Sequence, residues 1–157
     1  MSGRDPLDSP IAPHLTVSNA AAAIAFYQKA FGAEIVSRQT IPDGRTLHCA
    51  LALNGGVIHL SDEFPELTGG KRRTPDALGG TSVTIHLKVA DADAAFNRAV
   101  MAGATVTMPL ADVFWGARYG RLEDPFGHAW SIAQHKRTPT ESDLRQAVDR
   151  FLATGKS

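Results

Sequence analysis

His14-Leu15-Thr16-Val17 and His86-Leu87-Lys88-Val89 are two copies of one pattern, and their repetition decides the fold. Each tetrapeptide ends an apolar run and is followed at once by an alanine-rich segment with helical periodicity. These segments read SNAAAAIAFYQKAFGAEI over 18–35 and ADADAAFNRAVMAGATV over 90–106. The two copies lie 72 residues apart. A repeat of this kind indicates one supersecondary unit built twice.

Start and stop signals for a helix flank both alanine-rich segments. Ser18 or Asn19 can cap the first helix and Asp91 the second, because their side-chain oxygens accept backbone N–H groups that have no helical partner. Gly32 and Gly103 stand where a helix end favours a left-handed residue. The apolar stripes expected to pack on a sheet are Ile24, Tyr27 and Phe31 in the first helix and Phe96 and Val100 in the second.

Short strands separated by turn signals follow each helix. In the first half they are predicted over 34–41, 46–53 and 57–61, with turns at Pro42-Asp43-Gly44 and Asn54-Gly55-Gly56. In the second half the matching strands are predicted over 105–108, 117–122 and 129–133. The expected fold class is α+β, with two tandem βαβββ modules over 11–61 and 82–136 that form a cupped mixed sheet with the helices outside.

Three segments fall outside these modules. Residues 1–10 are polar and predict a flexible N-terminal arm. Residues 62–81 are rich in glycine and proline, as is typical of a linker or lid. Residues 137–157 predict a helical extension that starts with a capping box at Thr138-Pro139-Thr140-Glu141. Its apolar stripe, which must cover the body of the domain or a partner chain, is Leu144, Ala147, Val148, Phe151 and Leu152.

The composition argues against several classes of protein. A chain of 157 residues suits one compact domain, and its lone Cys49 allows no internal disulfide, so a reducing, cytoplasmic location is expected. Lys+Arg and Asp+Glu both number 16, and the longest basic run is Lys71-Arg72-Arg73, which argues against nucleic-acid binding. No apolar run approaches the ~20 residues of a membrane span. The N-terminus lacks the apolar core of a signal peptide.

Several segments, in the right order, resemble the vicinal oxygen chelate superfamily, and within it the PhnB-like glyoxalase/bleomycin resistance proteins. They are AIAFYQKAFGAE (23–34), PDGRTLH (42–48), the HLKV strand (86–89) and FWGARYGRLEDPFGHAWSIAQH (114–135). The resemblance covers about residues 11–136. It implies the fold given above, a small molecule held in a cavity between the two modules, and a homodimer. The superfamily contains many enzymes and also proteins that only bind.

The resemblance also implies where a metal would be held. In metal-dependent members each module supplies one ligand from its first strand and one from its last. These four places fall on Ala12, His59, Thr84 and Ser131. Only His59 is an ordinary metal donor, whereas a stable divalent site needs at least three protein donors. We therefore expect no cofactor, and no glyoxalase I reaction, because Ser131 replaces the metal-bound carboxylate.

Three histidines would face one cavity if the open side of the sheet lines it. His14 and His86 each lie two residues beyond a ligand place on the same strand face, and His59 occupies one. One interpretation is a shifted site for a divalent ion, Zn, Ni, Mn or Fe. The other is that His14 and His86 are repeat-related polar residues of a pocket or interface. His48 is a candidate base near pH 7, or a strand residue with satisfied hydrogen bonds.

The densest aromatic and cationic patch spans 114–119. Trp115 and Tyr119 can stack on a planar ligand, and Arg118 can pair with a carboxylate or phosphate. Alternatively, Trp115 belongs to the core and Arg118 pairs with Asp112 or Glu123. Further along, Trp130 is expected in the core, and Asp124-Pro125-Phe126-Gly127 is interpreted as a structural turn.

Three functions are open at this point. The first is a metal-free protein that binds a small organic molecule through His14, His59, His86, Trp115, Arg118, Tyr119 and Ser131. The second is an enzyme, either a divalent-metal-dependent lyase, isomerase or dioxygenase, or a metal-free acid–base catalyst using His48, His59 or His86. The third is an interaction module whose cavity is filled by side chains and whose C-terminal helix seals a dimer.

Overall fold

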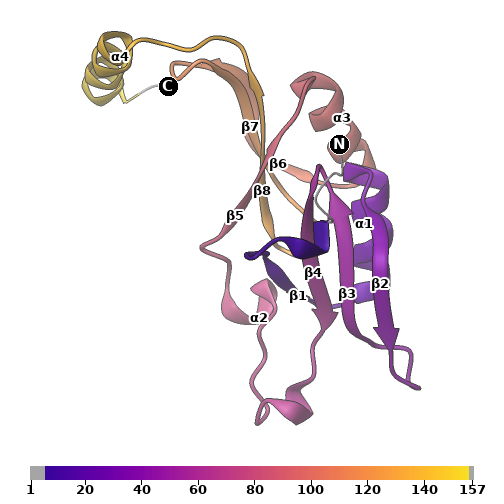
Figure 1. The fold of residues 1–157 in the computed structure, drawn as a ribbon. Coiled ribbons are helices and arrows are strands. Elements are labelled where there is room, and N and C mark those ends of the chain that lie inside the picture. Colours follow the sequence, from indigo (N-terminus) through magenta and orange to yellow (C-terminus); the bar gives the residue numbers. More distant parts are fainter. Residues whose placement is uncertain (1–5, 156–157) are drawn as a thin grey trace.

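Each half of the chain folds into one helix and four strands, as the repeat predicts. The computed structural model describes residues 6–155, and Figure 1 shows the two modules. The N-terminal module consists of β1 (His14–Val17), α1 (Ala20–Phe31), β2 (Glu34–Thr40), β3 (Thr46–Leu53) and β4 (Gly56–Asp62). The C-terminal module consists of β5 (Thr84–Lys88), α3 (Ala92–Ala102), β6 (Thr105–Val113), β7 (Ala117–Glu123) and β8 (Ala129–His135). The predicted α+β fold of two βαβββ modules is confirmed.

Each module builds a four-stranded mixed sheet with the same strand order, β1-β4-β3-β2 and β5-β8-β7-β6. The first strand runs parallel to the last, and the other pairs are antiparallel. The registers pair His14 with His59, Ala50 with His59, His86 with Ser131 and Arg121 with Ser131. Position 14 is therefore related by the repeat to 86, 59 to 131, and 48 to 119.

The two modules are joined by their helices, α1 and α3, which pack against each other (Figure 1). The helices start as predicted, since Asn19 and Asp91 each accept a backbone N–H of the first turn at 3.0 Å. At the end of α1, Gly32 is left-handed with φ of 69°. Arg98 of α3 donates from Nε to the Lys29 carbonyl oxygen at 2.8 Å. A guanidinium from one module thus satisfies the C-terminal end of the other module's helix.

The turn before β8 ties the modules together through a buried carboxylate, Asp124. One carboxylate oxygen accepts from Tyr27 Oη at 2.5 Å and from Trp130 Nε1 at 2.9 Å. The other accepts from the backbone N–H groups of Phe126 and His128. Burial, and then the charge of Asp124, raise the pKa of Tyr27 far above its ordinary value. The turn is structural, as interpreted, and it also links α1 to the second module.

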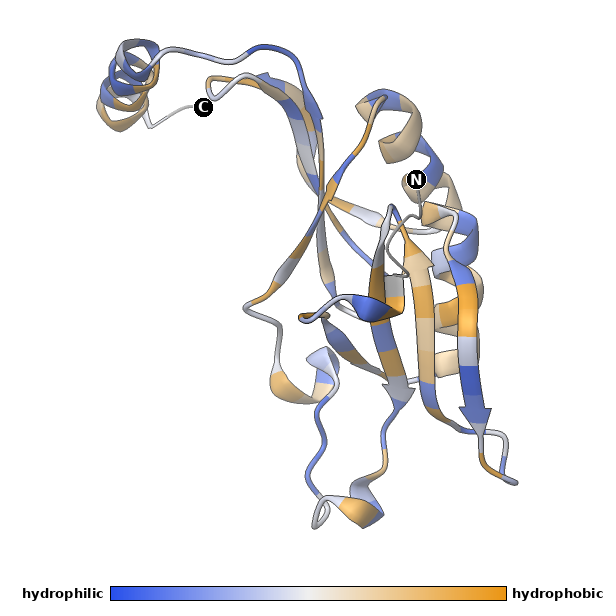
Figure 2. Ribbon diagram, viewed as in Figure 1, coloured by the Kyte–Doolittle hydropathy of each residue, from blue (hydrophilic) through white to orange (hydrophobic). Residues whose placement is uncertain are grey.

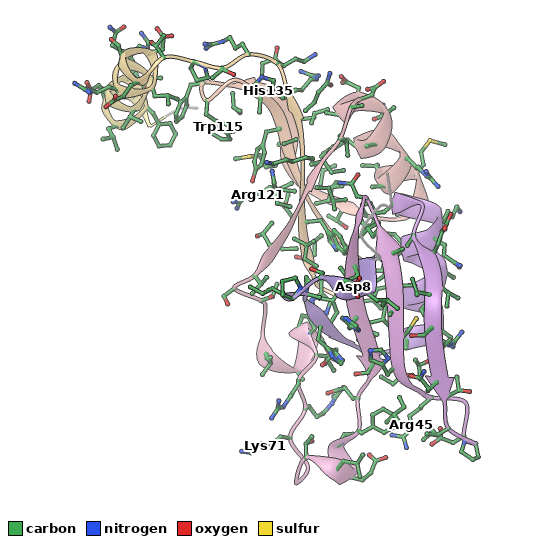
Figure 3. The ribbon with its side chains drawn as sticks, in the orientation of Figure 1. Asp8, Arg45, Lys71, Trp115, Arg121 and His135 are labelled. Atoms are coloured by element: carbon green, nitrogen blue, oxygen red, sulfur yellow. The ribbon has the colours of Figure 1, made fainter. Side chains whose placement is uncertain are left out.

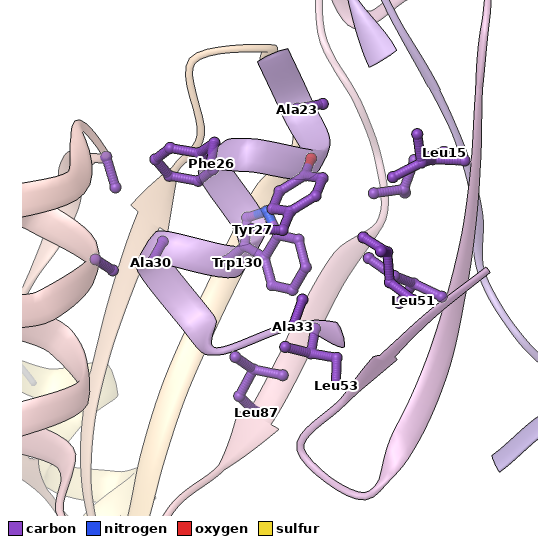
Figure 4. Packing of buried hydrophobic residues seen from close by; sticks show 14 of the residues in the cluster. Leu15, Ala23, Phe26, Tyr27, Ala30, Ala33, Leu51, Leu53, Leu87 and Trp130 are labelled. Atoms are coloured by element: carbon purple, nitrogen blue, oxygen red, sulfur yellow. The ribbon is translucent and has the colours of Figure 1, made fainter. Parts of the chain in front are cut away.

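The core confirms the predicted place of Trp130, which has no exposed surface. Its ring lies 5.3 Å from that of Tyr27 and 4.4 Å from that of Phe31, centroid to centroid. Figure 4 shows Trp130 and Tyr27 beside Leu51 and Leu87, which come from different modules. One cluster of buried apolar side chains therefore includes residues of both modules.

The prediction that a strand ends at Met108 was wrong, because β6 continues to Val113. The residue after Met108 is Pro109, and proline has no N–H for the ladder. The strand passes it with register irregularities between Val106 and Ala111. β6 is also the edge strand of its sheet. On an edge strand, a proline whose nitrogen faces away from the neighbouring strand removes no hydrogen bond between strands.

The segments outside the modules are more ordered than expected. Residues 1–5 of the expected arm lie outside the described residues, but Pro6–Asp8 forms a 3-10 helix, η1, against β4. The predicted linker contains a second 3-10 helix, η2 (Pro65–Leu67), and α2 (Pro75–Leu78). Arg45, from the β2–β3 turn, pairs with Glu66 at 2.6 Å. An ion pair therefore attaches the linker to the first module.

The C-terminal helix, α4 (Glu141–Thr154), begins two residues later than the predicted capping box. Thr140 is the N-cap and forms the box with Asp143. The chain is still extended at Lys136, which donates its N–H to the Gly116 carbonyl oxygen at 2.8 Å. Figure 2 shows hydrophilic and hydrophobic residues alternating around α4. In the described part of the chain no helix is long and apolar enough to cross a membrane.

Candidate functional site

Each sheet has one side covered by helices and one open side. Successive strand residues point to opposite sides. Leu15 and Cys49 are buried against the helices, so their neighbours His14 and His48 project from the other side. We call this side of β1-β4-β3-β2 the N-terminal face, defined by His14, His48 and His59. The repeat-related residues, His86, Tyr119 and Ser131, define the C-terminal face.

The N-terminal face carries a cluster of three imidazoles. The ring centroids lie 4.9 Å apart for His48 and His59, 6.1 Å for His14 and His48, and 6.3 Å for His14 and His59. His14 Nε2 also lies 3.3 Å from Ser61 Oγ. Burial first, and then the charges of His48 and His59, lower the pKa of His14. The environment of His14 therefore favours its neutral form.

A hydrogen-bond chain on this face links Gln39, His48 and His59. Gln39 Oε1 lies 3.2 Å from His48 Nδ1, and His48 Nε2 lies 2.7 Å from His59 Nδ1. If Gln39 Oε1 accepts from His48 Nδ1–H, then His48 Nε2 must accept from His59 Nδ1–H. The lone pair of His59 Nε2 is then left for another group. This hydrogen-bond chain was not predicted from the sequence, because only the pairing of β2, β3 and β4 brings its residues together.

The C-terminal face pairs one imidazole with hydroxyl groups. His86 Nδ1 lies 2.7 Å from Ser131 Oγ, and its ring centroid lies 6.1 Å from that of Tyr119. Arg121 Nε donates to Tyr119 Oη at 2.8 Å. Burial first, and then the charge of Lys88, lower the pKa of His86. At neutral pH this imidazole is therefore a neutral hydrogen-bonding group.

A pocket of about 520 Å³ opens over the C-terminal face. Its lining consists of His86, Lys88, Val89, Trp115, Gly116, Ala117, Ala133 and His135. Figure 3 shows Trp115 and His135 at the same end of the C-terminal module, near the strand that leads to α4. Of the predicted ligand residues, this pocket brings together His86 and Trp115, with Tyr119 beside both.

Gly116 explains why Trp115 is held over this face. Its φ is +89°, and a Cβ at this position would lie 2.0 Å from the Arg137 carbonyl oxygen. The Gly116 carbonyl oxygen in turn accepts the N–H groups of Lys136 and Arg137. Only glycine permits this close crossing of two backbones. The segment after β8 therefore clamps the hairpin end that carries Trp115.

Arg118 does not join the C-terminal face. Its guanidinium pairs with Asp93 of α3 at 2.9 and 3.0 Å and with Asp112 of β6 at 3.2 Å. Asp93 lies on the helix-covered side of the sheet, opposite the side of Tyr119. The structure thus favours the ion-pair alternative over the role in ligand binding. Trp115, in contrast, is 41% exposed and does not belong to the core.

The metal ligands implied by the resemblance do not fit this chain. Ser131 Oγ is engaged by His86, and Ala12 and Thr84 offer no imidazole, thiolate or carboxylate. The structure also places His14 and His59 on one sheet and His86 on the other. Within residues 6–155, no three His, Cys, Asp or Glu side chains are grouped so that they could hold a metal ion.

A second hollow, of about 490 Å³, does lie between the modules. It is lined by Ser18 after β1, by the linker around α2 and by the turn at Pro125–Gly127 before β8. None of the predicted ligand residues lines it. The predicted cavity between the modules and the predicted ligand residues are thus in different places in this chain.

The comparisons with known proteins agree with this architecture. The profile of the Glyoxalase/Bleomycin resistance protein/Dioxygenase superfamily matches residues 10–132. Uncharacterized protein Rv0887c of Mycobacterium tuberculosis (strain H37Rv) is 50% identical over 138 residues, which cover 88% of this chain and 81% of that protein. TioX from Micromonospora sp. ML1 has a TM-score of 0.64 at 27% identity, covering 81% of this chain and 98% of TioX. The PhnB protein from Bacillus cereus has a TM-score of 0.62 at 21% identity, covering 80% and 99%, a likeness of fold alone.

Proposed function

Since the chain belongs to the Glyoxalase/Bleomycin resistance protein/Dioxygenase superfamily, we propose that it binds a small organic molecule on its C-terminal face. The observation that carries this proposal is the pocket of about 520 Å³ beneath the half-exposed Trp115. Pockets of ~300–1,000 Å³ with apolar walls and a few polar groups suit small organic ligands. Val89, Ala117 and Ala133 supply the apolar wall, and His86 supplies a polar group.

The test is a thermal-shift screen of the full chain with a small-molecule library. A compound present at about 100 times its Kd stabilises the folded state by about 2.7 kcal/mol, which raises Tm by about 5–10 °C in a domain of this size. Trp115→Ala should abolish the shift for compounds bound at this pocket. His48→Gln, on the N-terminal face, is the matched control and should retain it. A hit whose shift survives Trp115→Ala but is lost in His48→Gln would move the site to the other face.

Acid–base catalysis on the N-terminal face is a second candidate function. It is favoured by the 2.7 Å contact between His48 Nε2 and His59 Nδ1, which leaves His59 Nε2 as an acceptor when His59 Nδ1–H donates to His48. This candidate requires turnover of a compound, lost in His59→Gln and kept in His86→Gln. A binding protein shows saturable binding of its hit compounds with no product detected by mass spectrometry.

We also propose that the chain forms a homodimer and works in the cytoplasm. The apolar side of α4 supports an interface, since Leu152 is 74% exposed and Val148 and Phe151 are also exposed. Deleting residues 138–157 should then lower the molar mass measured by sedimentation equilibrium. A truncated chain that remains a stable dimer would exclude α4 from the interface. The cytoplasmic location rests on Cys49, which is a free and buried thiol.

A further inference from the structure

The lining of the pocket on the C-terminal face includes a cationic side chain and no anionic one. The cationic side chain is that of Lys88. Within residues 6–155, no carboxylate forms an ion pair with the Lys88 ammonium. Arg118, by contrast, is paired with two aspartates. In a chain whose formal charges cancel, this pocket keeps one unpaired cation beside apolar walls.

The same pocket offers an aromatic surface. The indole of Trp115 makes perpendicular contacts with Phe114, at 89° and 5.0 Å, and with Tyr119, at 70° and 5.4 Å. These two contacts hold the plane of the indole, but neither ring is stacked parallel to it. The side chain is 41% exposed. A flat ligand ring can therefore stack on the exposed part of the Trp115 indole.

A competing cationic hollow lies under the linker. It has a volume of about 240 Å³ and is lined by Lys71 and Arg73 together with Asp62 and Glu63. Its lining therefore has as many carboxylates as cations, and Glu63 also accepts from the backbone N–H of Arg73 at 2.8 Å. The pocket on the C-terminal face is therefore the better place for an anion, and Lys71 provides a matched control.

We propose that the molecule bound on the C-terminal face is a planar aromatic anion, with its ring on Trp115 and its carboxylate or sulfonate group paired with Lys88. This inference rests on the proposed binding function and adds the chemical class of the ligand. His86 is neutral and is engaged with Ser131, so Lys88 supplies the charge. An ion pair is stronger at the mouth of an apolar pocket than in bulk water.

The test compares two fluorescent probes with the same aromatic framework. 8-Anilinonaphthalene-1-sulfonate carries an anionic group, whereas N-phenyl-1-naphthylamine lacks it. We expect the wild-type chain to bind the sulfonate probe about tenfold more tightly. Lys88→Met should reduce this preference to about onefold while leaving the neutral probe unaffected. Trp115→Leu should weaken both probes, and Lys71→Met should change neither. Circular dichroism checks that each variant is folded.

The outcomes separate the two proposals. Equal affinity for both probes in the wild type, or a sulfonate preference that survives Lys88→Met, overturns the inference about the anion but leaves a binding pocket. Loss of the preference in Lys71→Met instead places the anion under the linker and also overturns the inference. If neither probe shows saturable binding to the folded wild-type chain, and the thermal-shift screen gives no hit, the proposed function itself is rejected.

Discussion

The two modules have the same strand order and the same pairing of strands, but different side chains on their open faces. The N-terminal face has His14, His48 and His59, whereas the C-terminal face has His86, Tyr119 and Ser131 at the related positions. The modules also differ in what covers them. At the β6–β7 hairpin end the segment after β8 crosses Gly116, while at the related Gly44, in the β2–β3 turn, a Cβ would meet no atom within 4 Å.

The repeat therefore sets the strand arrangement of both modules, and a segment outside the repeat shapes the pocket on one of the two faces. Trp115 stands over the C-terminal face because residues 136–137 clamp the neighbouring glycine. That segment and α4 lie beyond residue 132, where the match to the family profile ends. The part of the chain outside the family's shared region thus helps to shape the candidate site. Four predictions test this comparison.

The largest expected effect on stability comes from removing the buried Asp124 carboxylate, which joins the two modules through its hydrogen bonds. Asp124→Ala removes the acceptor for Tyr27 Oη and Trp130 Nε1, both buried, and for two backbone N–H groups. Each buried donor left unpaired costs about 1–3 kcal/mol, so we expect a loss of about 4 kcal/mol or more in the free energy of unfolding. Urea denaturation measures it. Tyr27→Phe, which removes a single donor, should cost much less, and equal losses would contradict this account of the joint.

A smaller loss of stability should distinguish substitutions at the two repeat-related hairpin turns. Gly116→Ala places a Cβ 2.0 Å from the Arg137 carbonyl oxygen and keeps a positive φ, so it should cost about 3 kcal/mol. Gly44→Ala has the same problem of φ, at +92°, but meets no atom within 4 Å, and should cost about 1 kcal/mol. Thermal unfolding and probe binding check both variants. Similar losses would show that the crossing segment does not clamp the hairpin.

Lowering the pH should destabilise the folded protein through one histidine on each face. The pKa values of His14 and His86 lie below their ordinary value of 6.5, mainly because of burial. Their stabilising contribution is therefore complete above pH 6.5 and is lost as the pH falls from 6.5 through the lowered pKa values. His14→Gln and His86→Gln should each flatten the decline in unfolding free energy from about pH 7 to about pH 5, and the double variant should flatten it further. Chemical denaturation across this range provides the curve, and an unchanged slope in both single variants would contradict the prediction.

The smallest expected effect concerns Arg118. Because its guanidinium pairs with Asp93 and Asp112 away from the C-terminal face, Arg118→Gln should change binding of the sulfonate probe by less than about twofold. Fluorescence titration measures this, with Lys88→Met as the sensitive counterpart. A loss in Arg118→Gln as large as that in Lys88→Met would restore Arg118 as a ligand residue.

Much of the fold was predictable from the sequence because its signals are local. Asn19 and Asp91 cap helices through neighbouring N–H groups, and Gly32 ends a helix through its own φ. The failures also have local causes. The predicted strand ended at Met108, but β6 continues past Pro109 with a register irregularity and at an edge position. Thr138 was predicted as a helix cap, but the two residues before it, Lys136 and Arg137, donate their backbone N–H groups to the Gly116 carbonyl oxygen, and the helix starts later.

The candidate site was predictable only in part. Sequence analysis identified His86, Trp115 and Tyr119 but included Arg118, since composition does not say which side of a strand meets a partner such as Asp93. It omitted Lys88 and His135, which became candidates when the pocket placed them together. His48 was predicted as a candidate base or a strand residue with satisfied hydrogen bonds, and the register of β3 against β4 brings it to His59.

The two βαβββ modules follow from local sequence signals, because periodicity, caps and turns act over a few residues and occur in both copies of the repeat. Which residues from distant parts of the chain come into contact is set by the folded arrangement. The joint at Asp124, the histidine chain from Gln39 to His59 and the pocket beneath Trp115 all join residues from different strands or modules. Such contacts depend on strand register and helix packing, which fix the side and depth of every side chain at once.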